Sequence, residues 1–135
     1  MRTFEVTSSA RSRAAWRLLA RPSEWAEWSP HVKGAWGLGD PEVRDGALGA
    51  ARLLGLVPVP ARVTAKRRDR SWEWTVGPGL VRMAHRVEPL ADGGCRIAID
   101  LSGPPLLEPL MAATYGPLIE RALVRLARAA EERSV

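Results

Sequence analysis

The chain has 135 residues, 46% hydrophobic and 26% charged, which is typical of one globular domain over residues 1–135. No apolar run approaches the roughly 18–20 residues that cross a bilayer, and the alternating N-terminus lacks the apolar core of a signal peptide. The single cysteine, Cys95, excludes an internal disulfide. Together these features predict a cytoplasmic protein without a transmembrane segment.

The net charge of +5 comes almost entirely from arginine, because only two lysines are present. A chain rich in arginine, alanine, glycine and proline is what GC-rich coding produces. Basicity alone is therefore weak evidence for a nucleic-acid partner, and we do not expect one. The densest basic cluster lies at a predicted hairpin tip, where charges are usually solvated but could also meet an anionic macromolecule. This cluster, the basic hairpin, consists of Arg62, Lys66, Arg67, Arg68 and Arg70.

The first predicted elements are a strand and two short helices. Residues 2–7 alternate between apolar and polar side chains, which indicates a half-buried strand. The two serines that follow can cap a helix over residues 10–20. Residues 22–28 favour a second helical turn, in which Trp25 and Trp28 share a face and are expected to plug one end of the fold.

Six strands are predicted next, from two-residue periodicity and from glycine, proline and aspartate at the turns. Consecutive hairpins imply an antiparallel meander, and strict alternation implies that one face of the sheet is covered and the other lies in water. Within the third of these strands, Ala61, Val63 and Ala65 are expected on the side opposite Lys66. The predicted ranges are 31–38, 46–56, 58–68, 72–76, 81–90 and 95–101.

The last predicted element is a long amphipathic helix over residues 105–132. Pro117 within it predicts a kink, or a fresh helix start at that point. This helix is the one element large enough to cover the sheet, and a space between the two is the natural ligand cavity. The predicted apolar stripe follows helical spacing. It consists of Leu107, Leu110, Met111, Thr114, Leu118, Ala122, Leu126 and Ala130, widened by Ile119 and Leu123.

This order of elements resembles the START-like, or polyketide cyclase/dehydrase-like (SRPBCC), superfamily over nearly the whole chain. The resemblance implies an α+β helix-grip fold, in which a curved antiparallel sheet of about six to seven strands grips the C-terminal helix. It also implies a cavity for an apolar or aromatic small molecule, a lipid or a hormone; some members cyclise or dehydrate polyketides, and the superfamily has no universal catalytic motif. The stretches that carry the resemblance are 4–10 leading into a helix with Trp16, 22–30, 72–74 followed by 85–87, and 93–97 with the terminal helix.

The side chains expected to line the cavity lie on the covered face of the sheet and on the near side of the helix. Aromatic side chains there suit a planar ligand, because ring stacking adds to the burial of apolar area. The alternative is that they fill the core, since packed interiors leave few voids. The predicted ligand-binding residues are Trp36, Arg52, Trp72, Trp74, Met83, His85, Ile97, Ile99, Leu107, Met111, Tyr115 and Leu118, with Thr114 beside them.

Three of these residues carry polar chemistry. His85 is the inward-facing titratable residue of the strands and could act as a general acid or base or donate a hydrogen bond to a ligand carbonyl. The alternative is a core histidine satisfied by Tyr115, Thr114 or a backbone carbonyl. Tyr115 could offer its hydroxyl to a substrate oxygen, so His85 and Tyr115 are the catalytic candidates. Arg52 could meet an anionic group at the cavity mouth, or lie in water on an edge strand.

No metal or cofactor site is predicted, because the chain has two histidines and lacks HExxH, CxxC and Gly-rich phosphate motifs. Cys95 has no evident cationic activator and is interpreted as structural. Three functions remain: binding of an apolar or aromatic small molecule, a cyclase or dehydratase in the same cavity, and a macromolecular partner on the basic hairpin. The ligand, any turnover and the existence of a homodimer are left open.

Overall fold

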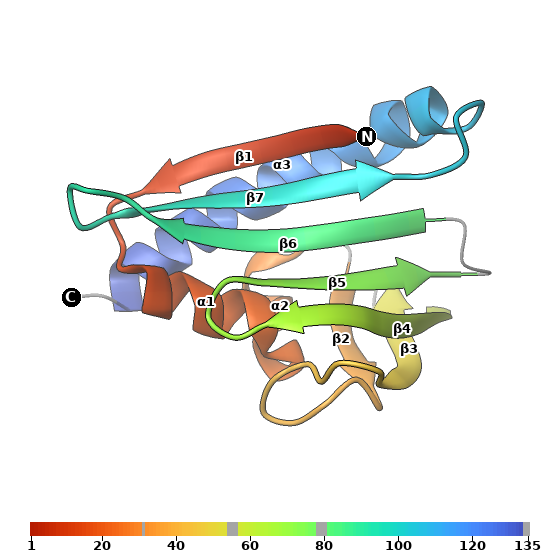
Figure 1. The fold of residues 1–135 in the computed structure, drawn as a ribbon, viewed down its shortest axis with the longest axis horizontal. Helices are drawn as coiled ribbons and strands as arrows, with labels where there is room; N and C mark the ends of the chain where they lie inside the picture. Colours follow the sequence, from red (N-terminus) through yellow and green to blue (C-terminus); the bar gives the residue numbers. More distant parts are fainter. Residues whose placement is uncertain (31, 54–56, 78–80, 134–135) are drawn as a thin grey trace.

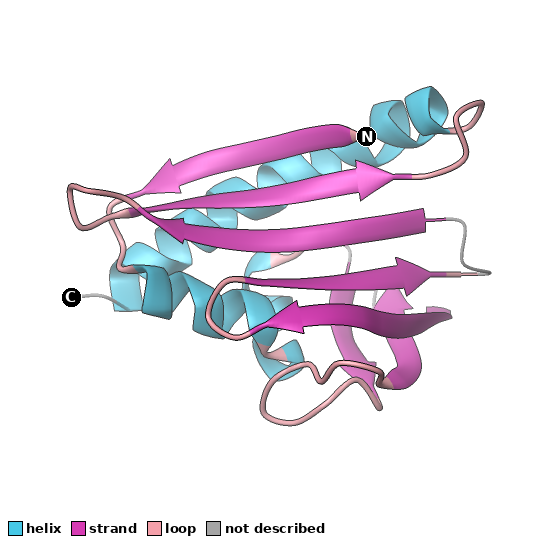
Figure 2. Ribbon diagram, viewed as in Figure 1, coloured by secondary structure: helices cyan, strands magenta, loops and turns pink. Residues whose placement is uncertain are grey.

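The computed structural model describes residues 1–30, 32–53, 57–77 and 81–133, which form a seven-stranded antiparallel sheet with helices on one face (Figures 1 and 2). The strands are β1 (Arg2–Ser8), β2 (Val32–Trp36), β3 (Leu48–Leu53), β4 (Val57–Arg67), β5 (Ser71–Val76), β6 (Val81–Pro89) and β7 (Cys95–Ser102). The helices are α1 (Ser12–Ala20), the 3-10 turn η1 (Pro22–Glu24), α2 (Trp25–Trp28) and α3 (Glu108–Arg133).

The strand order β1-β7-β6-β5-β4-β3-β2 is a meander from β2 to β7, to which β1 adds antiparallel to β7. The predicted α+β class and antiparallel meander are confirmed. Helix α3 packs on β1 and β7, and α1 fills the space between α3 and β6. The predicted alternation on β5, β6 and β7 is also confirmed, because Trp72, His85 and Ile99 are buried toward the helices while Glu88 is exposed.

The alternation predicted for β4 is wrong after Val63. The pairing of β4 with β5 passes from Val63 opposite Trp74 to Ala65 opposite Glu73, so one extra residue bulges between them. Because a bulge moves the following side chains to the other face, Ala65 is exposed. Lys66, expected in water, is partly buried instead, and its Nζ lies 3.0 Å from Oε1 of Glu42.

The expected serine cap on α1 is also wrong. Helix α1 begins after Arg11, which makes no side-chain capping hydrogen bond. Ser8 Oγ accepts a hydrogen bond from the backbone N–H of Ala10 (3.1 Å) and donates to Oε2 of Glu131 (2.9 Å). The serine therefore ties the end of β1 to the last turns of α3, a partner 123 residues away that local sequence does not reveal.

Helix α3 runs without interruption through Pro117, so the fresh start considered at that residue does not occur. Its buried face agrees with the predicted stripe only in the second half, where Ala122, Leu126 and Ala130 are buried. In the first half the prediction is wrong: Leu107, Leu110 and Thr114 are exposed. The reason is geometric, because the first turns of α3 project past the start of β1 and have no sheet beneath them (Figure 1).

Candidate functional site

A cavity of about 100 Å³ lies between α3 and the covered face of the sheet, with α2 and the β2–β3 hairpin closing one side. Helix α3 contributes side chains at positions 115, 119 and 122, which the helical repeat places on one face. No Asp, Glu, Lys or Arg side chain lines the cavity among the residues described. Its lining consists of Trp25, Trp28, Ser29, Val32, Ala51, Trp72, Trp74, Val76, Val81, Met83, His85, Ile99, Leu101, Tyr115, Ile119 and Ala122.

Aromatic rings form the inner wall. Trp25 lies nearly parallel to Trp72 with ring centroids 5.5 Å apart, and His85 stacks on Trp72 at 3.9 Å. Trp74 stands almost perpendicular to all three rings, with centroid distances of 5.4 Å to Trp25, 5.3 Å to Trp72 and 5.8 Å to His85. Edge-to-face and offset stacked pairs are the favoured arrangements of aromatic rings, so the rings of this wall are closely packed.

Three of the four indole N–H groups in this wall cap the end of α1. The carbonyls of the last helical turn have no partner within a helix. Trp28 Nε1 donates to the Leu18 carbonyl (2.9 Å), while Trp25 and Trp72 both donate to the Leu19 carbonyl (2.9 and 3.2 Å). The early helix and the strand β5 are therefore joined through the cavity wall itself.

Trp74 differs from the other three. Its side chain is 5% exposed and lines the cavity, but Nε1 has no acceptor within hydrogen-bonding distance anywhere in the described ranges. A buried donor without an acceptor is uncommon in native proteins and needs an explanation.

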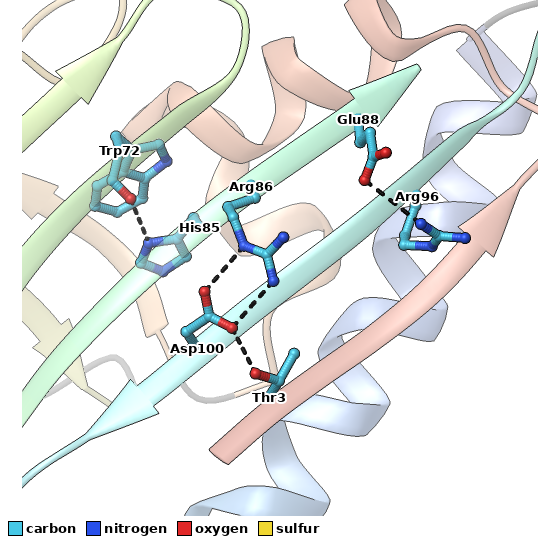
Figure 3. A network of polar contacts seen from close by, with 7 residues as sticks. All are labelled: Thr3, Trp72, His85, Arg86, Glu88, Arg96 and Asp100. Atoms are coloured by element: carbon cyan, nitrogen blue, oxygen red, sulfur yellow. Dashed lines mark hydrogen bonds and ion pairs between the residues drawn. The ribbon is translucent and has the colours of Figure 1, made fainter. Parts of the chain in front are cut away.

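His85 is buried, and Nδ1 lies 3.3 Å from the Trp72 carbonyl oxygen (Figure 3). A carbonyl can only accept, so Nδ1 carries the proton and Nε2 keeps its lone pair. Burial away from water lowers the pKa of His85 to about 4, although the Trp72 carbonyl and Asp100 act in the opposite direction. The imidazole is therefore neutral at physiological pH. Of the partners expected for a core histidine, the backbone carbonyl is the one observed.

The structure places half of the predicted ligand-binding residues against the cavity, including both catalytic candidates. Their roles in binding or catalysis stay predictions. The six residues are Trp72, Trp74, Met83, His85, Ile99 and Tyr115.

Two of the remaining predicted residues lie on the opposite face of the sheet. The side chain of Ala51 faces the cavity, and that of Arg52 does not. The prediction for β3 was therefore wrong by one residue, which exchanges the two faces of a strand. The Arg52 guanidinium lies over the Trp36 ring, 4.9 Å from its centroid, and Trp36 is 49% exposed. Both residues line a separate outer groove that also holds Asp40.

The other four miss the cavity for reasons of packing. Ile97 points to the covered face of β7, two residues before the cavity residue Ile99, but it is fully buried in the packed core. Leu107 and Met111 precede the part of α3 that faces the cavity, and Leu118 is turned to its side.

Several lining residues were missed by the sequence analysis. Trp25 and Trp28 were expected only to plug the fold, yet they form part of the wall. Ser29 and Val32 follow them into the lining. Ala51 was missed because small and apolar residues occur at both parities of β3, so alternation does not distinguish its two faces. Ile119 and Ala122 were predicted as apolar helix positions but not as ligand contacts.

The outer face of the sheet holds a polar network (Figure 3). Arg86 donates two hydrogen bonds to Asp100, at 2.9 and 3.1 Å, and Thr3 donates a third at 2.7 Å. Partial burial would raise the pKa of Asp100, but these hydrogen bonds hold it below its ordinary value. In the basic hairpin the four arginines are exposed, while Lys66 is engaged by Glu42.

The described ranges contain no group of three or more His, Cys, Asp or Glu side chains able to hold a metal ion. Cys95 is buried, and that burial raises the pKa of its thiol and so disfavours the reactive thiolate. None of the described helices combines the length and apolarity needed to cross a membrane.

The family described as "Polyketide cyclase / dehydrase and lipid transport" matches residues 2–131. The chain belongs to this polyketide cyclase/dehydrase and lipid transport family. The match spans β1 to the last turns of α3 and therefore includes every element that lines the cavity. No match is found among curated proteins.

Solved structures share the fold of this polyketide cyclase/dehydrase family member. Protein NE0264 from Nitrosomonas europaea is 12% identical with a TM-score of 0.78, over 98% of this chain and 94% of that one. Protein MLL2253 from Mesorhizobium loti is 15% identical with a TM-score of 0.77, over 99% and 100%. The di-domain ARO/CYC StfQ of the steffimycin biosynthetic pathway is 17% identical with a TM-score of 0.73, over 98% and 45%.

Proposed function

We propose that this protein binds a small, neutral, apolar molecule in the cavity between α3 and the sheet. The observation that carries the proposal is the cavity lining, which is almost wholly aliphatic and aromatic and holds no ionised group among the described residues. Apolar pockets with a few placed polar groups are the usual form of small-molecule sites. Because Arg52 lies on the other face, the anionic ligand group considered for it has no counterion here.

The cavity volume limits the ligand. Sites for drug-sized molecules usually enclose about 300–1,000 Å³, while an engineered apolar cavity of about 150 Å³ accepts benzene. The cavity of about 100 Å³ is therefore limited to guests no larger than a single compact ring. A larger guest, such as a polycycle or an acyl chain, requires the cavity wall near Tyr115 to move outward.

Benzene and toluene are suitable single-ring probes, and tryptophan fluorescence is a direct readout because four tryptophans line the cavity. We expect saturable quenching by both probes. Ala122→Leu fills the cavity from α3 and should weaken binding at least roughly tenfold. Ala113→Leu, on the exposed side of the same helix, should leave it unchanged. If neither probe binds saturably to the unmodified protein, the proposal is refuted.

A cyclase or dehydratase activity in the same cavity is the second candidate, because His85 and Tyr115 both line it. A histidine whose pKa is about 4 is a weak base at neutral pH, and general bases work best with a pKa near the operating pH. Binding therefore remains the first proposal. His85→Gln separates the two: it should abolish turnover of a polyketide substrate in the second case and largely preserve affinity in the first.

A further inference from the structure

His85 places a hydrogen-bond acceptor in the buried part of the cavity lining. Its Nδ1 lies 3.3 Å from the Trp72 carbonyl oxygen, which can only accept, so Nδ1 carries the proton. The pKa of His85, about 4, keeps the ring neutral at pH 7. Nε2 therefore presents a lone pair, and the single N–H group of the ring is already used by the protein.

Nε2 is accessible from the cavity. It makes no hydrogen bond to another residue of the described chain. In the described ranges, the side-chain nitrogen and oxygen atoms that are fully enclosed and lack a partner are Arg21 Nε and Trp74 Nε1, and His85 Nε2 is not one of them. A molecule the size of water can therefore reach part of its surface. Because His85 is only 4% exposed and lines the cavity, that access is from the cavity side.

The imidazole is held in this orientation by its neighbours. Its face stacks on Trp72 with ring centroids 3.9 Å apart and an interplanar angle of 8°, while its Nδ1–H bonds to the carbonyl of the same residue. Trp74 meets it at 76°, with centroids 5.8 Å apart. A flip that exchanged the two ring nitrogens would break the bond to the Trp72 carbonyl. The acceptor is therefore preorganised, which lowers the entropic cost of binding a ligand to it.

The other polar atoms of the described lining do not offer the same contact. Ser29 Oγ accepts a hydrogen bond from the backbone N–H of Val32 (3.0 Å), and Tyr115 is 38% exposed at the cavity mouth. Trp74 Nε1 is enclosed by protein atoms, and the thioether of Met83 is only a weak acceptor. A guest at the inner wall therefore meets its strong acceptor at His85.

We propose that the ligand of this cavity is a neutral molecule with an N–H or O–H donor, and that this donor bonds to Nε2 of His85. The inference rests on the proposed function and specifies the ligand's polar group. It favours rings such as pyrrole or phenol over ethers and ketones, whose oxygen atoms would face the lone pair. An ammonium or a carboxylate is disfavoured, because the described lining holds no counterion for a buried charge.

Pyrrole and furan test the proposal, because the two rings have nearly the same size and differ at one atom. Pyrrole donates an N–H and has no lone pair to offer, whereas furan has an oxygen and no donor. Both are smaller than benzene. The quantity to compare is the ratio of furan to pyrrole dissociation constants, measured by NMR titration at pH 7 in the unmodified protein and in each variant. Comparing this ratio between proteins cancels the difference in hydration between the rings.

We expect the unmodified protein to prefer pyrrole. His85→Phe keeps a ring against Trp72 but removes the acceptor, so it should reduce this preference roughly two- to tenfold, the value of one hydrogen bond. Met83→Leu is the matched control: Met83 lines the cavity from the same strand and leucine has a similar volume, so the preference should persist. An unchanged preference in a folded His85→Phe variant would overturn the inference.

A second measurement needs no variant. In the ¹⁵N-labelled protein, the resonance of the unprotonated Nε2 of His85 should move upfield when pyrrole is added, because accepting a hydrogen bond shields that nitrogen. It should remain nearly in place with furan. A proton found on Nε2, or a resonance that saturating pyrrole does not move, overturns this inference while leaving the cavity as a binding site. If pyrrole, furan, benzene and toluene all fail to bind, the proposed function itself fails.

Discussion

The two halves of α3 differ although they belong to one continuous helix. From Ile119 to Ala130 the side facing the sheet is buried against α1, β1 and β7. Before Pro117, Leu110 is 65% exposed, and Leu106, just ahead of the helix, is 94% exposed. The comparison teaches that apolar content alone does not decide burial: the sheet must extend beneath the helix, and it does so for only one half.

The boundary between the halves is close to the cavity. A Cβ atom added at Gly116 would lie 3.2 Å from the Phe4 ring of β1, so the helix backbone packs directly on that ring. Tyr115, one residue earlier, lines the cavity and is still exposed to solvent. The second half thus holds the fold together, and the first half supplies the part of the wall that a large guest would displace.

The largest expected effect separates the halves directly. Leu126→Ala removes a fully buried side chain and should lower the free energy of unfolding by about 2–5 kcal/mol. Leu110→Ala removes an equal volume from water-exposed surface and should change it by less than about 0.5 kcal/mol. Urea denaturation of both variants measures the difference. Equal losses would show that the first half is packed against the protein in solution.

The pH dependence of the unfolding free energy tests the buried side of the cavity, where His85 lies. Its pKa is lowered to about 4 in the folded protein, against 6.5 when unfolded. The unfolded chain therefore binds the proton first as the pH falls. The stability that His85 confers is complete above pH 6.5 and is lost between pH 6.5 and about 4. The total is about 3 kcal/mol.

The measurement is the free energy of unfolding at several pH values, with His85→Gln as the control because glutamine does not titrate. Subtracting the variant's profile from that of the unmodified protein removes the contribution of the carboxylates. A difference that stays flat between pH 4 and 6.5 would mean that the ring is hydrated, as Tyr115 is at the cavity mouth.

Pro117 marks the junction of the two halves, and its replacement tests whether the first half is held loosely. Proline lacks the N–H that would bond the carbonyl four residues earlier. Pro117→Ala restores that donor at an exposed position and should stabilise the protein by roughly 1–3 kcal/mol. Hydrogen exchange should slow in residues 108–116 and hardly change in residues 119–130. If residues 108–116 and 119–130 were equally protected from hydrogen exchange in the unmodified protein, the first half of α3 would not be the more loosely held one.

Much of the fold follows from local sequence. Two-residue alternation located β5, β6 and β7 and their covered face, and helical spacing located α3 as a whole. The errors arose where pairing with another element, and not the local pattern, decides. The bulge after Val63 reverses the sides of β4, and Ser8 bonds to Glu131 rather than to α1.

The candidate site was less predictable than the fold. Residues on regular strands, such as Trp72 and His85, follow from alternation alone. Arg52 and Trp36 did not, because small and apolar residues occur on both sides of β3 and a one-residue error exchanges its faces. The part played by Trp25 depends on how α2 packs, which no periodicity encodes.

The smallest expected effect compares two tryptophans of the cavity wall that differ in one hydrogen bond. Trp28→Phe leaves the Leu18 carbonyl without its indole donor, whereas Trp74→Phe removes an N–H that had no acceptor. Both changes remove a similar ring area from the core. A stranded buried polar group costs about 1–3 kcal/mol, so Trp28→Phe should be the more destabilising by roughly 1 kcal/mol or more. Thermal and urea unfolding of the ligand-free variants measure this difference. If Trp74→Phe were the more destabilising, its N–H would have an acceptor in solution that the structure does not show.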